Sequence, residues 1–187
     1  MASTADFRNG MTINLDGTLF TILWFQHHKP GKGNTVVRSK LRNVLTGAVL
    51  EKTFRAGERI DEVRLEHRPM TYSYSDGHFY HFMDSQTYED IPLSGAVIGD
   101  DQLKYLKEGM EVDGLVHGES VISVELPYFV VLTVTQTDPG VRGDTATGGT
   151  KPATLETGAV VQVPLFLNEG DVIRVDRRED KYMERAK

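Results

Sequence analysis

The sequence HHKPGKGN occupies residues 27–34 and lies between two runs that are typical of β-strands, residues 19–25 and 35–42. Proline fixes its own φ, and glycine lowers the steric cost of a tight reversal, so this stretch predicts the turn of a hairpin. Lys32 stands within the turn, with a glycine on each side. We therefore expect a projecting hairpin whose tip presents the ammonium group of Lys32.

The charge around this hairpin differs from that of the whole chain. The 187 residues carry a formal net charge of −6, which argues against indiscriminate coating of nucleic acid. Residues 17–50 nevertheless contain no Asp or Glu, and they include Arg38, Lys40 and Arg42. Because side chains alternate along a strand, these three cations are expected on one side of it, as a stripe that can face phosphate groups. A solvated strand face is the alternative interpretation.

Strand signals dominate the rest of the chain. Turn pairs at residues 16–17 (Asp-Gly), 46–47 (Thr-Gly) and 76–77 (Asp-Gly) separate apolar runs and predict hairpins. The pattern restarts near residue 65 and again near residue 128. The sequence thus predicts three strand-rich domains, residues 1–65, 66–127 and 128–187.

Two segments interrupt the strand pattern. One short helix is expected at residues 102–107, with Asp100 and Asp101 as candidate N-caps and Gly109 beyond its end. The Gly- and Thr-rich segment between residues 138–140 and 151–152 is expected to be a long exposed loop.

The sequence excludes several kinds of chemistry. The absence of cysteine removes disulfides, thiolate nucleophiles and cysteine zinc sites. No export signal and no apolar run of about 20 residues is present, so we expect a cytoplasmic protein without a membrane partner. Lys32 is not followed directly by Ser or Thr, as a phosphate-binding loop requires. His78 and His81 are three apart on an expected strand and should face opposite sides. We expect no enzyme activity, no cofactor and no metal.

Several strings in fixed order resemble bacterial elongation factor P. They are KPGKG at residues 29–33, RSKLR at 38–42, TDPG at 137–140, GDTAT at 143–147 and KPATLETG at 151–158. The resemblance covers essentially the whole chain. It implies an all-β fold of three small β-barrel domains, an SH3-like (KOW-type) N-terminal barrel followed by two OB-fold barrels. This agrees with the three strand-rich domains.

The resemblance also implies a function. Members of this family bind the ribosome beside peptidyl-tRNA (tRNA-Pro) and promote peptide-bond formation at consecutive-proline stalls, and the tip residue is often modified by an enzyme. Lys32 occupies that position, at the peptidyl-transferase centre, in a tip loop with Lys29, Pro30, Gly31 and Gly33. The implied tRNA or rRNA contacts are Arg38, Lys40, Arg42, Tyr182 and Arg185. The implied loop at the exit-site codon contains Gly143, Asp144, Thr145 and Thr147.

Three alternative functions remain open, of which one is an enzyme, to be tested by a nucleotide-hydrolysis assay. An elongation-factor-P-like paralogue would share the three-domain plan but differ at the tip and in the third-domain loop, and the intact KPGKG and GDT strings favour the main interpretation. A general single-stranded RNA-binding OB protein would bind free oligonucleotides with a steep salt dependence, which the acidic balance of the chain disfavours. For the main interpretation we expect a monomer.

Overall fold

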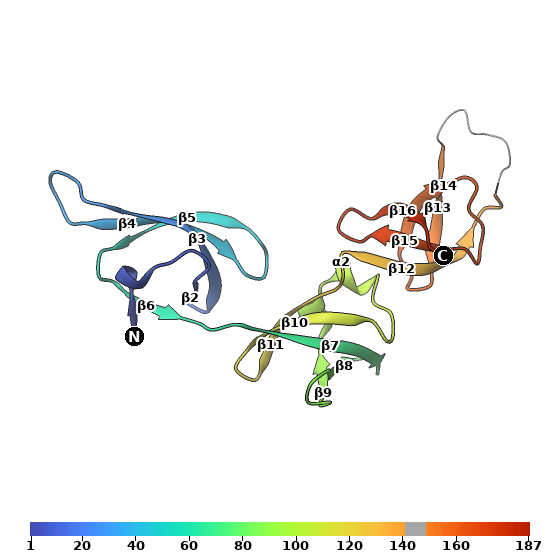
Figure 1. Cartoon of the computed structure of the whole chain (residues 1–187), viewed down its shortest axis with the longest axis horizontal. Helices are drawn as coiled ribbons and strands as arrows, with labels where there is room; N and C mark the ends of the chain where they lie inside the picture. The colour runs from blue at the N-terminus through green and yellow to red at the C-terminus, as the bar shows by residue number, and fades with distance from the viewer. Residues whose placement is uncertain (141–148) are drawn as a thin grey trace. The chain divides into compact units, whose positions relative to one another are not determined.

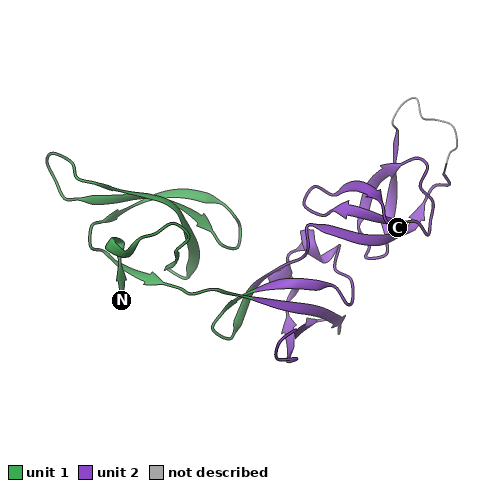
Figure 2. Cartoon of the chain, in the orientation of Figure 1, with its two compact units in different colours: residues 1–67, 115–122 green, residues 68–114, 123–187 purple. Residues whose placement is uncertain are grey.

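The computed structural model describes residues 1–140 and 149–187 and is built mainly from β-strands (Figure 1). The strands form three sheets. The chain divides into two compact units, residues 1–67 with 115–122 and residues 68–114 with 123–187 (Figure 2). The all-β prediction is confirmed, whereas the limits of the three domains stay a prediction.

The first sheet has the strand order β1-β6-β2-β3-β4-β5. Its strands are β1 (Ala2–Ser3), β2 (Thr12–Leu15), β3 (Thr18–His28), β4 (Val36–Asn43), β5 (Val49–Arg55) and β6 (Arg59–Glu62). Asp16 and Gly17 both have positive φ, 50° and 87°, and join Leu15 to its partner Thr18. This is the predicted two-residue turn, in which both central residues must adopt positive φ.

Aromatic and aliphatic side chains fill the inner face of this sheet. Ile22 and Leu41 are fully buried, and the ring of Phe7 packs edge-on against Phe54 and Phe25, with ring centroids 5.3 Å and 5.9 Å apart. Edge-to-face contacts of this kind add about 1 kcal/mol each beyond the burial of area. The inner face of β3, β4 and β5 is therefore fixed by the core.

The second sheet has the order β11-β10-β7-β8-β9. Its strands are β7 (Glu66–Ser75), β8 (Tyr80–Asp84), β9 (Asp90–Leu93), β10 (Glu111–His117) and β11 (Ser120–Glu125). The predicted turn between β7 and β8 is present. Its Asp76 carboxylate accepts hydrogen bonds from the backbone amides of His78 and Phe79, at 2.8 Å and 2.7 Å.

The prediction of a helix at residues 102–107 is wrong in its limits. Two short helices are present, α1 (Gly95–Ile98) and α2 (Asp100–Leu103). Asp100 and Asp101 lie in the first turn of α2, and the N-cap position is Gly99, which has no capping side chain and a φ of 88°. Carboxylates in a first turn interact favourably with the free amides of a helix. Asp100 and Asp101 therefore do mark the start of the helix, but they lie in its first turn and not at the N-cap position.

The third sheet is a closed barrel, β12-β13-β14-β16-β15. Its strands are β12 (Phe129–Thr137), β13 (Thr150–Leu155), β14 (Val160–Pro164), β15 (Val172–Asp176) and β16 (Lys181–Arg185). Most of the predicted Gly- and Thr-rich loop, residues 141–148, lies outside the described residues, and β13 begins at Thr150, the last residue of that segment. Lys151 in β13 is only 5% exposed, and its ammonium donates hydrogen bonds to the backbone oxygens of Asp138 and Leu167.

Within the second compact unit, the segment after α2 is tied to the barrel. The fully buried Tyr105 donates a hydrogen bond from its hydroxyl to Asp180, at 2.5 Å, and the ammonium of Lys104 lies 2.8 Å from the same carboxylate. Burial, together with the neighbouring Asp180 carboxylate, raises the pKa of Tyr105 well above its usual range. The hydroxyl therefore stays protonated and remains a donor.

Candidate functional site

Lys32 lies in the loop that joins β3 to β4. The last strand pair is His28 with Val36, which leaves residues 29–35 as a seven-residue loop with Lys32 at its centre. Lys32 is exposed. The sequence placed His27 and His28 in the turn, but both belong to β3. Because β5 pairs along β4 as far as Val36, only the seven-residue loop extends beyond the sheet (Figure 1).

The two glycines beside Lys32 are not equivalent. Gly33 has a φ of 122°, a conformation that L side chains rarely adopt, whereas Gly31 does not have a positive φ and has open space where a Cβ would lie. The sequence assigned the same role to both glycines. Of these two positions, only position 33 has a backbone conformation that requires glycine.

A matched pair of substitutions tests this difference. Gly33→Ala should strain the loop by about 1 kcal/mol, which corresponds to roughly fivefold in rate if the loop geometry positions Lys32. Gly31→Ala should change the rate by less than twofold, because its Cβ enters open space. Synthesis of a Pro-Pro-Pro peptide in a purified translation system measures both. Equal rates for the two variants would contradict a requirement for this loop conformation.

The predicted cationic stripe is present on β4. Arg38, Lys40 and Arg42 are exposed, and they alternate with the buried Val37, Ser39 and Leu41. The inner side chains are held by the core and by a hydrogen bond from the Ser39 hydroxyl to the backbone oxygen of Lys52, at 2.7 Å. The three cations consequently share the outer face of the sheet.

A β-bulge in β3 adds Trp24 to this face. Ile22 pairs with Leu41 and Trp24 pairs with Lys40, so Leu23 is an extra residue without a partner on β4. A bulge of one residue reverses the alternation of side chains that follow it. Trp24 therefore points outward, 42% exposed, while Phe25 turns inward against Phe7.

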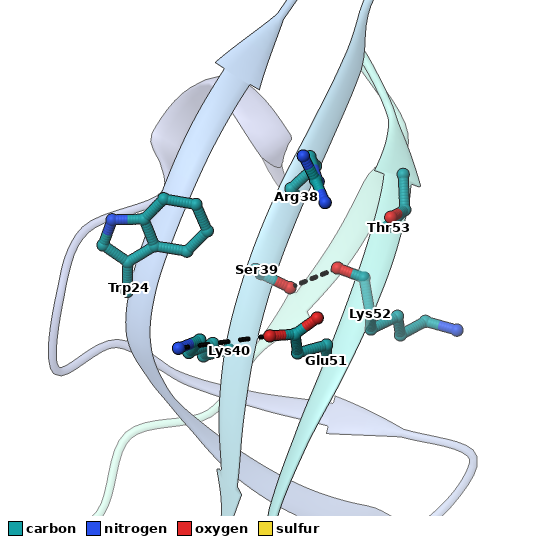
Figure 3. A pocket seen from close by; sticks show the side chains of 7 residues that line it. All are labelled: Trp24, Arg38, Ser39, Lys40, Glu51, Lys52 and Thr53. Carbon is teal, nitrogen blue, oxygen red and sulfur yellow. Dashed lines mark hydrogen bonds and ion pairs between the residues drawn. The ribbon is translucent and has the colours of Figure 1, made fainter.

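Sequence reasoning missed Trp24 as a site residue. The residues around it form one apolar run, in which a tryptophan is expected to belong to the core. Figure 3 shows the indole of Trp24 on β3 on the same side of the sheet as Arg38 and Lys40 on β4 and Glu51 on β5, and all four residues line one pocket. The sequence offered one signal, that Trp24 is the sole tryptophan of the chain.

One acidic side chain faces the stripe. Glu51 pairs with Lys40 across the strands, and its carboxylate lies 4.0 Å from the Lys40 ammonium. Both side chains are largely exposed, 52% for Lys40 and 73% for Glu51. Exposed pairs at this separation contribute about 0 to 1 kcal/mol, so Lys40 can exchange Glu51 for another anion at little cost.

Tyr182 and Arg185 lie on β16, in the other compact unit. The guanidinium of Arg185 lies 3.2 Å from the Asp171 carboxylate and 5.3 Å from the ring centre of Phe166. Burial raises the pKa of the Tyr182 hydroxyl. Arg185 thus has partners within the barrel, and its role as an RNA contact stays a prediction. Gly143, Asp144, Thr145 and Thr147 lie outside the described residues.

His81 forms a separate charged cluster on β8. Its two ring nitrogens lie 2.8 Å from Asp90 and 2.8 Å from Asp76, and its ring stacks on Tyr74 with centroids 4.4 Å apart. Both nitrogens can donate only in the protonated imidazolium. The hydrogen bonds that His81 donates to Asp76 and Asp90 accordingly raise the pKa of His81, and the bond accepted from His81 lowers the pKa of Asp76. His78, in contrast, is exposed in the preceding turn.

This cluster predicts a pH dependence of stability. The raised pKa of His81 adds stability that is complete below the ordinary histidine value of about 6.5 and is lost as the pH rises through the folded-state pKa. The lowered pKa of Asp76 adds stability that is complete above the ordinary value of about 3.9 and is lost in stronger acid. The contribution of the cluster is thus largest between about pH 4 and pH 6.5.

His81→Gln removes the titrating group and tests the cluster. The difference in unfolding free energy between the unchanged protein and His81→Gln should be largest near pH 5 and shrink above about pH 6.5. Urea unfolding followed by circular dichroism at several pH values measures this difference. His78→Gln is the control and should follow the unchanged protein. A difference that is independent of pH would contradict an imidazolium at position 81.

Within residues 1–140 and 149–187, no group of three or more His, Asp or Glu side chains could hold a metal ion. Across the same residues, no helix has the length and hydropathy needed to cross a membrane.

The comparisons with known proteins agree with this architecture. Three family models match in succession: the elongation factor P KOW-like domain at residues 3–60, the elongation factor P OB domain at residues 65–124 and the elongation factor P C-terminal domain at residues 130–185. A translation initiation factor eIF-5A family protein from Naegleria fowleri has a similar fold, with a TM-score of 0.54, 10% identity and coverage of 67% of this chain and 96% of that one. The fold is therefore that of linked KOW-like and OB domains, as predicted.

Curated relatives match over their full length. Elongation factor P of Pelotomaculum thermopropionicum is 56% identical over 186 residues, with 100% of both chains covered. That of Thermoanaerobacter sp. (strain X514) is 55% identical over 186 residues and also covers 100% of both. That of Acaryochloris marina is 56% identical over 185 residues, 99% of this chain and 100% of that one. The chain belongs to the elongation factor P family, and it is a translation elongation factor.

Proposed function

We propose that this protein binds the ribosome beside peptidyl-tRNA and promotes peptide-bond formation at consecutive-proline stalls, with Lys32 positioning the tRNA end. The observation that carries the proposal is the exposed Lys32 at the centre of a loop that extends beyond the first sheet. The adjoining strand β4 bears the exposed Arg38, Lys40 and Arg42 on one face. A cationic tip next to a cationic face suits a partner whose backbone is made of phosphates.

The mechanism is one of positioning. Proline fixes its own φ, so consecutive prolines restrict the nascent chain and can misplace the reacting groups. A stall that slows the step about 100-fold corresponds to about 2.7 kcal/mol. A few charge-assisted hydrogen bonds from Lys32 to the tRNA end are sufficient for this amount. The protein then restores orientation, and the ribosome performs the reaction.

Lys32 is also the proposed target of a modifying enzyme. Its side chain is exposed, and it lies at the centre of the loop beyond the last strand pair, His28 with Val36. An added group would lengthen the reach of the side chain. Intact-mass and peptide mass spectrometry of protein from its own host identifies such a group.

The remaining contacts belong to the same proposal. Tyr182 and Arg185 would contact tRNA or rRNA, and residues 143–147 would approach the exit-site codon. The protein would act in the cytoplasm as a monomer, without a cofactor. The family models and the curated relatives favour this assignment over a paralogue, because all of them carry the name elongation factor P.

The direct test compares two peptides in a purified translation system. Addition of the protein should accelerate the synthesis of Pro-Pro-Pro strongly and that of a peptide without proline by less than twofold. Equal acceleration of both peptides would contradict a role at proline stalls. Binding to free single-stranded oligonucleotides with an affinity that matches ribosome binding would favour the general RNA-binding alternative.

A further inference from the structure

A cavity of about 420 Å³ lies on the outer face of the first sheet. It is bordered by Trp24 on β3, Arg38 and Lys40 on β4, and Glu51 on β5 (Figure 3). The volume is within the range of about 300–1,000 Å³ that is usual for small-ligand sites. The cavity is open to solvent, and its walls combine an aromatic face with cationic side chains.

The indole of Trp24 is a free aromatic surface. It is 42% exposed. In the part of the chain that the structure describes, neither an aromatic ring nor a cation is paired with it, whereas Arg174 and Arg178 lie over Phe129 in the barrel. The bulge at Leu23 is what turns Trp24 outward. A large apolar side chain kept on the surface between cations points to a ligand with a flat face.

The charges beside the indole define the ligand further. Arg38 and Lys40 are two residues apart on the same strand, and therefore about 6.6 Å apart along it. Glu51 is the acidic residue of the cavity, and its pair with Lys40, at 4.0 Å, is weak enough to be exchanged. The site thus suits a ligand that carries negative charges on either side of an aromatic group.

We propose that this cavity binds one unpaired nucleotide of an RNA chain, with its base stacked on Trp24 and the adjoining phosphates paired with Arg38 and Lys40. The inference rests on the proposed function, because Arg38 and Lys40 also belong to the cationic face of β4 that is proposed to contact RNA. A base inside a duplex is already stacked on its neighbours and cannot reach the indole, so the site selects single-stranded segments. The cations supply the affinity for phosphate, and Trp24 supplies the preference for an unpaired base.

Trp24 provides its own signal for the test. It is the sole tryptophan of the 187 residues, so the intrinsic fluorescence of the protein reports on this cavity. Titration with a single-stranded RNA hexanucleotide at low salt should quench the fluorescence. A blunt RNA duplex of the same length should quench it weakly, and a duplex with a short single-stranded overhang should quench it like the hexanucleotide.

Variants measured with a labelled hexanucleotide separate stacking from charge. Trp24→Ala should weaken binding about tenfold, and Trp24→Phe, which keeps an aromatic face, by less than about threefold. Arg38→Gln should weaken binding and lower the slope of log affinity against log salt by about 0.7. Glu51→Gln should strengthen binding about twofold, because a repelling charge is removed.

Arg59→Gln is the matched control. Arg59 is exposed on β6, which β2 and β3 separate from β4 in the sheet, and it does not line this cavity. This variant has the same change of net charge as Arg38→Gln and should bind RNA within twofold of the unchanged protein. Equal effects of the two variants would overturn a site on the outer face.

Other outcomes also decide the inference. Equal quenching by blunt duplex and single strand, unchanged binding by Trp24→Ala, or quenching by an acidic peptide in place of RNA would each overturn it. The proposed function fails separately, if Lys32→Ala supports Pro-Pro-Pro synthesis as well as the unchanged protein does. Fluorescence quenching by RNA would stand in that case, because Lys32 is not part of the cavity.

Discussion

Replacement of Lys32 by alanine is expected to lower the rate of Pro-Pro-Pro synthesis about 100-fold, to the rate measured without the protein. Lys32 stands at the centre of the seven-residue loop, and the residues directly before and after it are glycines, which have no side chain. Removal of its ammonium removes the charge-assisted hydrogen bonds that orient the tRNA end. These bonds are proposed to lower the barrier to peptide-bond formation by about 2.7 kcal/mol. The measurement should use protein from its own host, so that any group attached to Lys32 is retained.

Three controls make this result specific. Lys32→Arg keeps the charge, so full activity of this variant would show that the charge is sufficient, and loss of activity would indicate that the amine or an attached group is required. Lys52→Ala removes an exposed cation from β5 and should leave the rate unchanged. The thermal unfolding midpoint of Lys32→Ala should also stay unchanged, because the side chain is exposed. Unchanged rescue by Lys32→Ala would end the proposal.

Replacement of Lys151 by methionine is expected to destabilise the C-terminal barrel by about 3 kcal/mol, or roughly 150-fold in its unfolding equilibrium. The ammonium of Lys151 is buried and donates hydrogen bonds to the backbone oxygens of Asp138 and Leu167, the latter at 2.6 Å. Methionine has a similar length but no donor, so both carbonyl groups lose this partner. A buried acceptor without a partner costs about 1–3 kcal/mol.

An opposing effect must be weighed. Burial of a charge is itself costly, and replacement of a whole buried ion pair by apolar residues can be neutral. At Lys151 the acceptors are backbone carbonyl groups, which no side-chain substitution removes. We therefore expect the loss of hydrogen bonds to exceed the gain from removing the charge.

Lys181→Met is the control for this substitution. Lys181 is an exposed lysine on β16 of the same barrel, and the same chemical change there should alter stability by less than about 0.5 kcal/mol. Unfolding should be followed by circular dichroism and by hydrogen exchange of β13, because Trp24 lies in the other compact unit. Equal stability of the two variants would contradict a structural role for Lys151.

Much of the fold was predictable because local chemistry determines it. The Asp16-Gly17 turn requires positive φ at both positions, and the alternation along β4 separates Arg38, Lys40 and Arg42 from a buried face. These features depend on residues that are close in sequence. Arg38, Lys40 and Arg42 lie on one strand, so their shared face could be predicted for the same reason.

Other features depend on contacts between distant residues and could not be predicted. The burial of Lys151 was not predicted, because lysine is rarely buried and its burial depends on the carbonyl groups of Asp138 and Leu167, which come from other parts of the chain. The strand β16 contains mostly charged residues and is recognised only because it closes the barrel. The partners of His81 come from a turn and from β9, so sequence spacing could not reveal them.

Because of the extra residue at Leu23, the number of residues in β3 determines which side chains after it face the solvent. Loss of a single residue there would exchange the two sides of the strand beyond that point, so that the indole entered the interior and the phenyl group of Phe25 reached the solvent. Two proteins with the same kinds of residues in this segment, but differing by one in their number, would then offer different surfaces to a partner. A count of residues, and not only their identity, is therefore what a comparison of related chains must examine at this strand.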